Sequence, residues 1–209
     1  MSRSRQALLG VLLLLVGLAI ALQAPRPGVA APGPRLASAV FAGGCFWCTE
    51  ADFDKLPGVV STTSGYSGGR SADATYERVS AGGTGHIEVV KVVYDPARVS
   101  YQRLVARFFR TVDPLDAGGQ FCDRGSQYAS AIFVANPAER RVAQATKARA
   151  AALLKKAIAT QILPAAPFYP AEGYHQDYYK KNATKYKYYR WRCGREARLA
   201  KVWGSSAGH

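Results

Sequence analysis

Four apolar runs rich in β-branched residues predict strands in the chain. They cover residues 38–42, 59–66, 86–94 and 128–135. The first run ends at Gly43-Gly44, which favours a strand that leads into a tight turn, and the third ends at Asp95-Pro96. Alternation along 86–94 places Glu88 on the same face as three apolar residues, so we expect burial to raise the pKa of this carboxyl.

Three segments between these runs predict helices. Residues 45–56 form one, which Pro57-Gly58 ends. A second begins behind the N-cap Ser100, where apolar residues follow at helical spacing from 101 to 109. A third runs on from Pro137, and its apolar stripe consists of Ala150, Leu153, Leu154, Ala157 and Ile158. Strands that alternate with helices predict an α/β or α+β sandwich around one sheet.

The N-terminus carries the pattern of a secretory signal peptide over residues 1–30. Arg3 and Arg5 precede an apolar run over 7–22, and small residues follow at 28–30. The run has 16 residues, fewer than the roughly 20 of a membrane-spanning helix. We therefore expect a cleaved, periplasmic protein with no stable membrane insertion; the alternative is a membrane anchor formed by an uncleaved leader. A Pro/Gly linker over 31–37 precedes a single catalytic domain over 38–209.

Composition and charge narrow the class of protein. The chain has 209 residues, 48% of them hydrophobic, which suits one core. The net charge is +14, and the leader's three arginines leave +11 for the mature part. Six tyrosines alternate with basic residues over 174–195, a pattern that can bind single strands of nucleic acid. The exported location argues against that partner, and the absence of a phosphate-binding glycine loop predicts no organic cofactor.

Cys45 carries the strongest chemical signal. It lies at the predicted junction between strand and helix, where free N–H groups and the helix dipole stabilise a thiolate. Cys45 and Cys48 also form a C-x-x-C pair, which is typical of thiol–disulfide oxidoreductases. A third interpretation pairs all four cysteines in structural disulfides. Cys122 and Cys193 stand alone and far apart, so the spacing does not favour a metal site.

The order of several motifs distinguishes among these alternatives. GCFW, GYSGG, TYERV, GTGHIEVVKVVYDP, GSQYASAIF and EGYHQDYY follow one another along 38–209, and the set resembles the A-type peptide methionine sulfoxide reductases. The resemblance implies a single-domain, two-layer α/β sandwich with a ferredoxin-like core and a mixed sheet. It also implies reduction of methionine S-sulfoxide, free or in proteins. Cys45 would attack the sulfoxide sulfur and become a sulfenic acid, and a second thiol would then close a disulfide.

The resemblance assigns further residues to roles. Glu88 would be the general acid for the sulfoxide oxygen, which Tyr76 and Tyr128 would hydrogen-bond. The substrate-binding residues would be Phe46, Trp47, Asp123 and His175. No metal or cofactor is implied, and nothing indicates more than a monomer.

Two positions depart from the family's common pattern. Cys48 stands where most members have glycine, and Ala129 stands where arginine is common. Three thiols could resolve the sulfenic acid, and we rank Cys193 first, with Cys48 and Cys122 behind it. A thioredoxin-like protein would reopen the disulfide. A carrier that only exchanges thiols and disulfides through Cys45 and Cys48 remains the alternative function.

Overall fold

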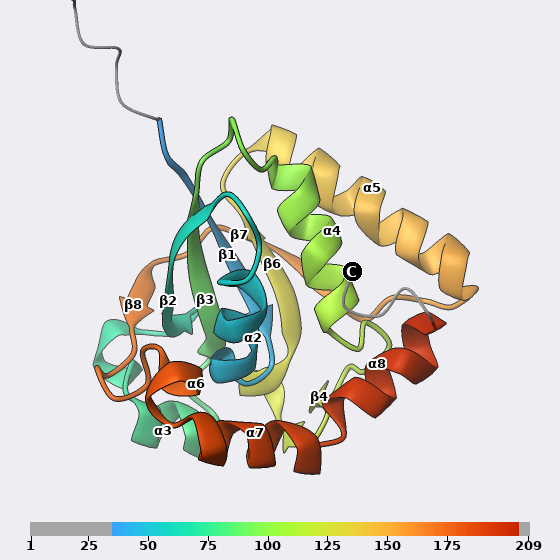
Figure 1. Cartoon of the computed structure of the whole chain (residues 1–209). Coiled ribbons are helices and arrows are strands. Elements are labelled where there is room, and N and C mark those ends of the chain that lie inside the picture. Colours follow the sequence, from blue (N-terminus) through green and yellow to red (C-terminus); the bar gives the residue numbers. More distant parts are fainter. Residues whose placement is uncertain (1–34, 205–209) are drawn as a thin grey trace, which may run out of the picture. The chain divides into compact units, whose positions relative to one another are not determined.

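A mixed six-stranded sheet forms the centre of the computed structural model, in the order β7-β6-β1-β3-β2-β8 (Figure 1). The structure describes residues 35–204, all within the second of the two units, Pro34–His209, into which the chain divides. The strands are β1 (Ala37–Gly43), β2 (Val59–Ser67), β3 (Ile87–Tyr94), β6 (Ser130–Val134), β7 (Gln161–Pro164) and β8 (Phe168–Pro170). Only the β6–β7 pair is parallel; the other four pairs are antiparallel.

A short hairpin stands apart from this sheet. It consists of β4 (Gly119–Gln120) and β5 (Asp123–Arg124), and its tip holds Phe121, which has a φ of 57°. The described helices are α2 (Phe46–Phe53), α3 (Tyr76–Ala81), α4 (Tyr101–Thr111), α5 (Pro137–Leu154), α6 (Tyr178–Lys181), α7 (Ala183–Arg192) and α8 (Arg195–Trp203), with short 3-10 turns η1 (Ser71–Asp73) and η2 (Ser126–Tyr128).

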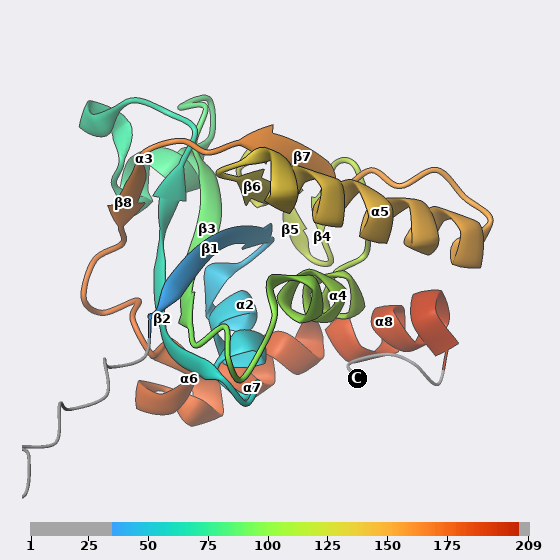
Figure 2. The same ribbon diagram turned by 90° about the horizontal axis from the view of Figure 1, so that it is seen from above.

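Helices α2, α4, α5 and α8 contribute to one hydrophobic core with one face of the sheet. Phe41 of β1 stacks on Phe53 of α2 and Phe108 of α4, with ring centroids 4.8 and 5.3 Å apart. Val90 and Val92 of β3 join the same core. Figure 2 shows α4 and α5 side by side in this layer. The predicted α/β fold with a mixed sheet is therefore confirmed.

The predicted strands are all present, and two predicted helices end earlier than expected. The helix predicted over 45–56 ends at Phe53. The helix from Pro137 ends at Leu154, because Lys155 adopts a left-handed conformation with φ of 51°. The proposed stripe is therefore wrong at its end: Leu153 is 60% exposed, and Ile158 is buried from the following loop. The hydrophobic periodicity of α3 and α6–α8 is too weak to predict these helices from the sequence.

The expected signal peptide (1–30) and most of the expected linker (31–37) lie outside the described residues. Within residues 35–204 none of the helices has the length and apolar character that crossing a membrane requires.

Candidate active site

Two glycines shape the turn that presents Cys45. A Cβ on Gly44, which has a φ of +78°, would lie 2.5 Å from Cβ of Gln120. A Cβ on Gly43 would lie 2.5 Å from Oγ1 of Thr49. A larger residue at either position would displace its neighbour. Glycine at both positions therefore allows the sharp turn from β1 into α2. Cys45 is the N-cap of α2, as the sequence predicts.

Burial controls the protonation of the two free thiols. Cys45 and Cys48 are 6% and 2% exposed. Burial raises the pKa of Cys45 well above its ordinary value, and the adjacent Cys48 thiol raises it further. The adjacent Cys45 thiol in turn lowers the pKa of Cys48, aided by the charges of Arg195 and Arg190. Burial thus opposes the ionisation of Cys45 that the helix N-terminus favours.

Glu88 lies at the N-terminus of α2, beside Cys45. Its Oε2 accepts the backbone N–H of Phe46 at 3.0 Å, and the residue is 2% exposed. Burial raises the pKa of Glu88 to about 8, and the negative charge of Asp123 adds to the effect of burial. The carboxyl group is therefore largely protonated at neutral pH, as the alternation along β3 predicts.

Tyr76 and Tyr128 approach Glu88 from two other elements, the start of α3 and the end of η2. Both are half-buried. Burial raises the pKa of each phenol, and the negative charge of Glu88 raises it further in both cases. Glu172 holds the start of α3, because its Oε1 accepts the backbone N–H of Tyr76 at 2.8 Å. Two neutral phenols and a protonated carboxyl are thus brought together.

An aromatic cluster adjoins these groups. Indole Nε1 of Trp47 donates to Nδ1 of His175 at 3.0 Å, and the Phe46 ring centroid lies 5.0 Å from that imidazole. Burial lowers the pKa of His175, so the ring is neutral and carries its proton on Nε2. Trp47 also stacks on Tyr178, with ring centroids 3.8 Å apart. The cluster can hold an apolar group beside polar donors.

Asp123 faces the site from β5. Its Oδ2 accepts the hydroxyl of Tyr189 at 2.5 Å, and burial raises the pKa of its carboxyl. The charge of Asp123 in turn contributes to the raised pKa of both Cys45 and Glu88. The structure therefore brings all the predicted catalytic and substrate-binding residues to one region.

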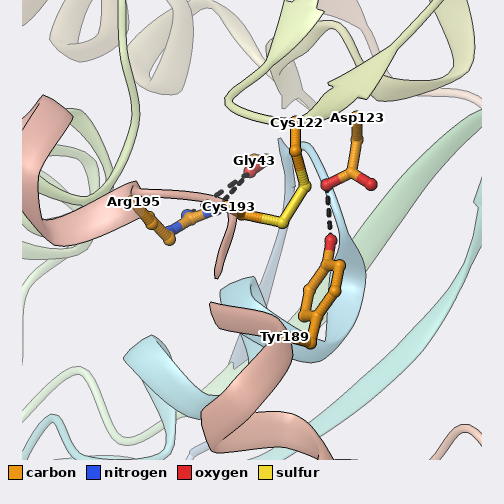
Figure 3. The surroundings of a disulfide bond; sticks show 6 residues. All are labelled: Gly43, Cys122, Asp123, Tyr189, Cys193 and Arg195. Atoms are coloured by element: carbon orange, nitrogen blue, oxygen red, sulfur yellow. Dashed lines mark hydrogen bonds between the residues drawn. A yellow bond between two sulfur atoms is a disulfide. The ribbon is translucent and has the colours of Figure 1, made fainter. Parts of the chain in front are cut away.

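A disulfide joins Cys122 to Cys193, 71 residues later (Figure 3). It connects the tip of the β4–β5 hairpin to the end of α7. Cys193, the thiol ranked first as the resolving group, is thus bonded to Cys122 in this structure, while Cys45 and Cys48 are free. Within residues 35–204, Cys122, Asp123 and Cys193 are the one cluster with ligand atoms close enough for a metal ion. Both of its sulfurs are in the disulfide, so they are not available as thiolate ligands.

Sequence reasoning missed four residues around the site. Tyr189 and Glu172 hold Asp123 and Tyr76 in place. Asp52 and Arg195 are buried, and their charges act on the pKa of Cys48. Glu172 could have been found, because it precedes His175 by three residues in the EGYHQDYY motif. No local sequence motif indicates a role for the other three residues.

Comparisons with known proteins identify the family of this chain. The family model described as peptide methionine sulfoxide reductase matches residues 37–207. "Peptide methionine sulfoxide reductase MsrA 2" of Caulobacter vibrioides is 51% identical over 184 residues, which cover 88% of this chain and 92% of the relative. The protein of that name from Rhizobium meliloti is 53% identical over 169 residues, or 81% of this chain and 84% of the relative.

Solved structures show the same fold. Mxr1 from Saccharomyces cerevisiae in reduced form has a TM-score of 0.68 and 33% identity, with 73% of this chain and 88% of that chain covered. Methionine sulfoxide reductase A of Corynebacterium diphtheriae has a TM-score of 0.64 and 33% identity, with 77% and 86% covered.

Proposed function

The chain belongs to the peptide methionine sulfoxide reductase family, and on that premise we propose that it reduces the S epimer of methionine sulfoxide, free and in proteins. The enzyme reduces methionine sulfoxide, and the proposal concerns the epimer, the residues that act and the path of the electrons. The observation that carries the proposal is the protonated Glu88 beside Cys45 at the N-terminus of α2.

In the first half-reaction Cys45 attacks the sulfoxide sulfur. The S–O bond breaks, the oxygen passes to the Cys45 sulfur, and methionine leaves; the substrate gains two electrons and Cys45 becomes a sulfenic acid. Glu88 donates a proton to the oxygen as negative charge builds there, and the phenols of Tyr76 and Tyr128 hydrogen-bond that oxygen. The proton that the Cys45 thiol loses passes to the Glu88 carboxylate and restores its neutral form.

The substrate side chain fits the aromatic cluster. Phe46 and Trp47 would surround the S-methyl group, because apolar rings favour this group over water. His175 holds the Trp47 ring through the indole N–H. Asp123 is positioned to accept a backbone N–H of the substrate, with its own carboxylate fixed by Tyr189.

In the second half-reaction Cys48 attacks the sulfenic acid. A Cys45–Cys48 disulfide forms and water leaves. Two observations support Cys48 over Cys193: the backbone N–H of Cys48 donates to the carbonyl oxygen of Cys45 at 3.1 Å, which keeps the two residues adjacent, and the Cys193 sulfur is bonded to Cys122. Helical residues at this spacing hold their Cβ atoms about 5–6 Å apart, too far for a disulfide. Cys45 has the non-helical dihedrals φ −47° and ψ 119°, which relaxes that constraint.

A thioredoxin-like dithiol protein would then return the enzyme to its reduced state, with the Cys122–Cys193 pair as an outer redox couple. The pattern over 1–30 supports a periplasmic location for the mature enzyme and hence a periplasmic or membrane-tethered donor. Fractionation of cells that express the full chain tests the location. A mature protein found only in the cytosol would contradict it.

The first experiment is epimer-resolved reduction of a blocked methionine sulfoxide by the protein with dithiothreitol, beside the Cys45→Ser variant. We expect consumption of the S epimer alone, and none by the variant. A sulfenic acid that persists in Cys48→Ser, trapped by dimedone, supports Cys48 as the resolving thiol. The adjacent free thiols of Cys45 and Cys48 favour one competing function, that of a carrier that exchanges disulfides. Disulfide exchange without loss of sulfoxide would favour that carrier and reject the reductase.

A further inference from the structure

The disulfide between Cys122 and Cys193 is accessible to another protein, whereas the thiols that reduce the substrate are buried. Cys122 is exposed and Cys193 is half-buried, whereas Cys45 and Cys48 are 6% and 2% exposed. We propose that a dithiol donor protein docks on the outer face of α7 and attacks the sulfur of Cys122. This inference rests on the proposed function, because it requires that the enzyme be reduced after each turnover.

The electron path starts with exchange at the exposed sulfur. A donor thiolate attacks Sγ of Cys122, the Cys122–Cys193 bond breaks, and Cys193 leaves as a thiolate. The donor's second thiol then attacks the mixed disulfide, so that Cys122 is released and the donor is oxidised. Two electrons now reside on the outer pair. Attack at Cys122 follows from access, because Cys122 is exposed and its partner Cys193 is half-buried (Figure 3).

The released Cys193 is placed to carry these electrons inward. It follows α7 directly, and the next residue, Gly194, has a φ of +64° and no atom within 4 Å of the position that a Cβ would occupy, which suits a hinge. Tyr189, one turn earlier in α7, donates to Asp123 beside Cys122. Tyr189 packs against the cluster that contains Cys48 and also lines the hollow beside Cys122 and Cys193, so this ring lies between the outer and the inner pair. The Cys193 thiolate would attack the Cys45–Cys48 disulfide, form a mixed disulfide and release one inner thiolate. Cys122 would then attack the Cys193 sulfur, which releases the other inner thiolate and reforms the outer disulfide.

An aromatic surface surrounds the point of attack. Tyr188, Tyr189 and Arg192 line a hollow together with the two bonded cysteines. Tyr188 is 58% exposed and Trp191 is 72% exposed, and their ring centroids lie 6.0 Å apart. No other large hydrophobic residue within 35–204 is as exposed as Trp191. Exposed tryptophan and tyrosine beside a hollow are typical of protein-binding surfaces.

The charge of this face specifies the partner. Lys185, Lys187 and Arg192 are exposed on α7, and none forms an ion pair within the described part of the chain. Arg190 is different, because Asp52 and Glu196 neutralise it. We therefore infer a donor whose reactive cysteine is surrounded by apolar and acidic side chains, since such a face would complement both the rings and the cations.

A trapping experiment tests the point of attack. The oxidised protein is mixed with a thioredoxin whose second active-site cysteine is replaced by serine, so that the mixed disulfide persists. Peptide mass mapping should locate the link at Cys122. A link at Cys193, Cys48 or Cys45, or no link at all, would overturn the inference.

Surface variants test the docking face. Trp191→Ala and Arg192→Glu should each raise the KM for the protein donor by roughly tenfold, since an interface anchor contributes more than about 1.4 kcal/mol, a tenfold factor. The matched controls are Leu153→Ala, at an apolar position on α5 that is 60% exposed, and Arg141→Glu. Both controls should leave that KM unchanged, and neither α7 variant should slow turnover with dithiothreitol.

The outcomes separate this inference from the proposed function. A first turnover that yields one methionine per enzyme, with no effect of the α7 variants on the donor KM, rejects the docking face and retains the reductase. No methionine in the first turnover rejects the reductase itself.

Discussion

Replacement of Glu88 by glutamine should make the protein more stable and nearly inactive. The glutamine side chain has the shape of the carboxyl group, and its amide oxygen can accept the Phe46 N–H in place of Oε2. It never ionises, however, and it cannot deliver a proton to the sulfoxide oxygen. A single change therefore separates the stability of the site from its chemistry.

The magnitude follows from the raised pKa of Glu88, about 8 against an ordinary 4.5. Between these two values the unfolded chain has lost the proton that the native state keeps, so stability falls as pH rises. At pH 5 the cost to the native state is under about 1 kcal/mol, and at pH 8 it reaches about 4 kcal/mol. Glu88→Gln should thus gain roughly 3 kcal/mol on the wild type between pH 5 and pH 8.

Urea denaturation of both proteins at pH 5 and pH 8 measures this gain. Glu77→Gln, which removes an exposed carboxyl from α3, controls for the change in net charge. The single-turnover rate of Glu88→Gln should fall by roughly 10²–10⁴-fold. A stability difference that does not change with pH would refute the reasoning, because Glu88 would then be ionised in the folded protein.

Three further changes probe the site and the core. Tyr128→Phe should slow the single turnover by roughly 10²-fold without a loss of stability; an unchanged rate would remove its hydroxyl from the reaction. Asp52→Ala leaves Arg195 buried without its carboxylate and should cost about 3–5 kcal/mol in urea denaturation, a result that a loss under about 1 kcal/mol would contradict. Phe108→Ala, at a position with no exposed surface, should cost about 3–5 kcal/mol in the same assay, and a smaller loss would show that the core closes around the gap.

Local pattern was enough to predict the centre of the site. Gly43-Gly44 between an apolar run and a helix predicted where Cys45 lies, because a strand, a turn and a helix start each depend on a few adjacent residues. The period of two along β3 predicted that Glu88 faces the core, because alternation follows from strand geometry alone. The order of the motifs added the family and the aromatic partners of Cys45.

Tertiary structure decided what these groups experience. The pairing of Cys122 with Cys193 depends on how the end of α7 meets the β4–β5 hairpin, and no spacing within the chain encodes that meeting. The raised pKa of Cys45 likewise depends on the segments that cover it, because the loss of water is a property of the packed site and not of the helix end. Sequence by itself determined which atoms can react, through local geometry. Long-range packing decided which sulfurs are free and which protons stay on, because burial and proximity exist only once distant segments meet.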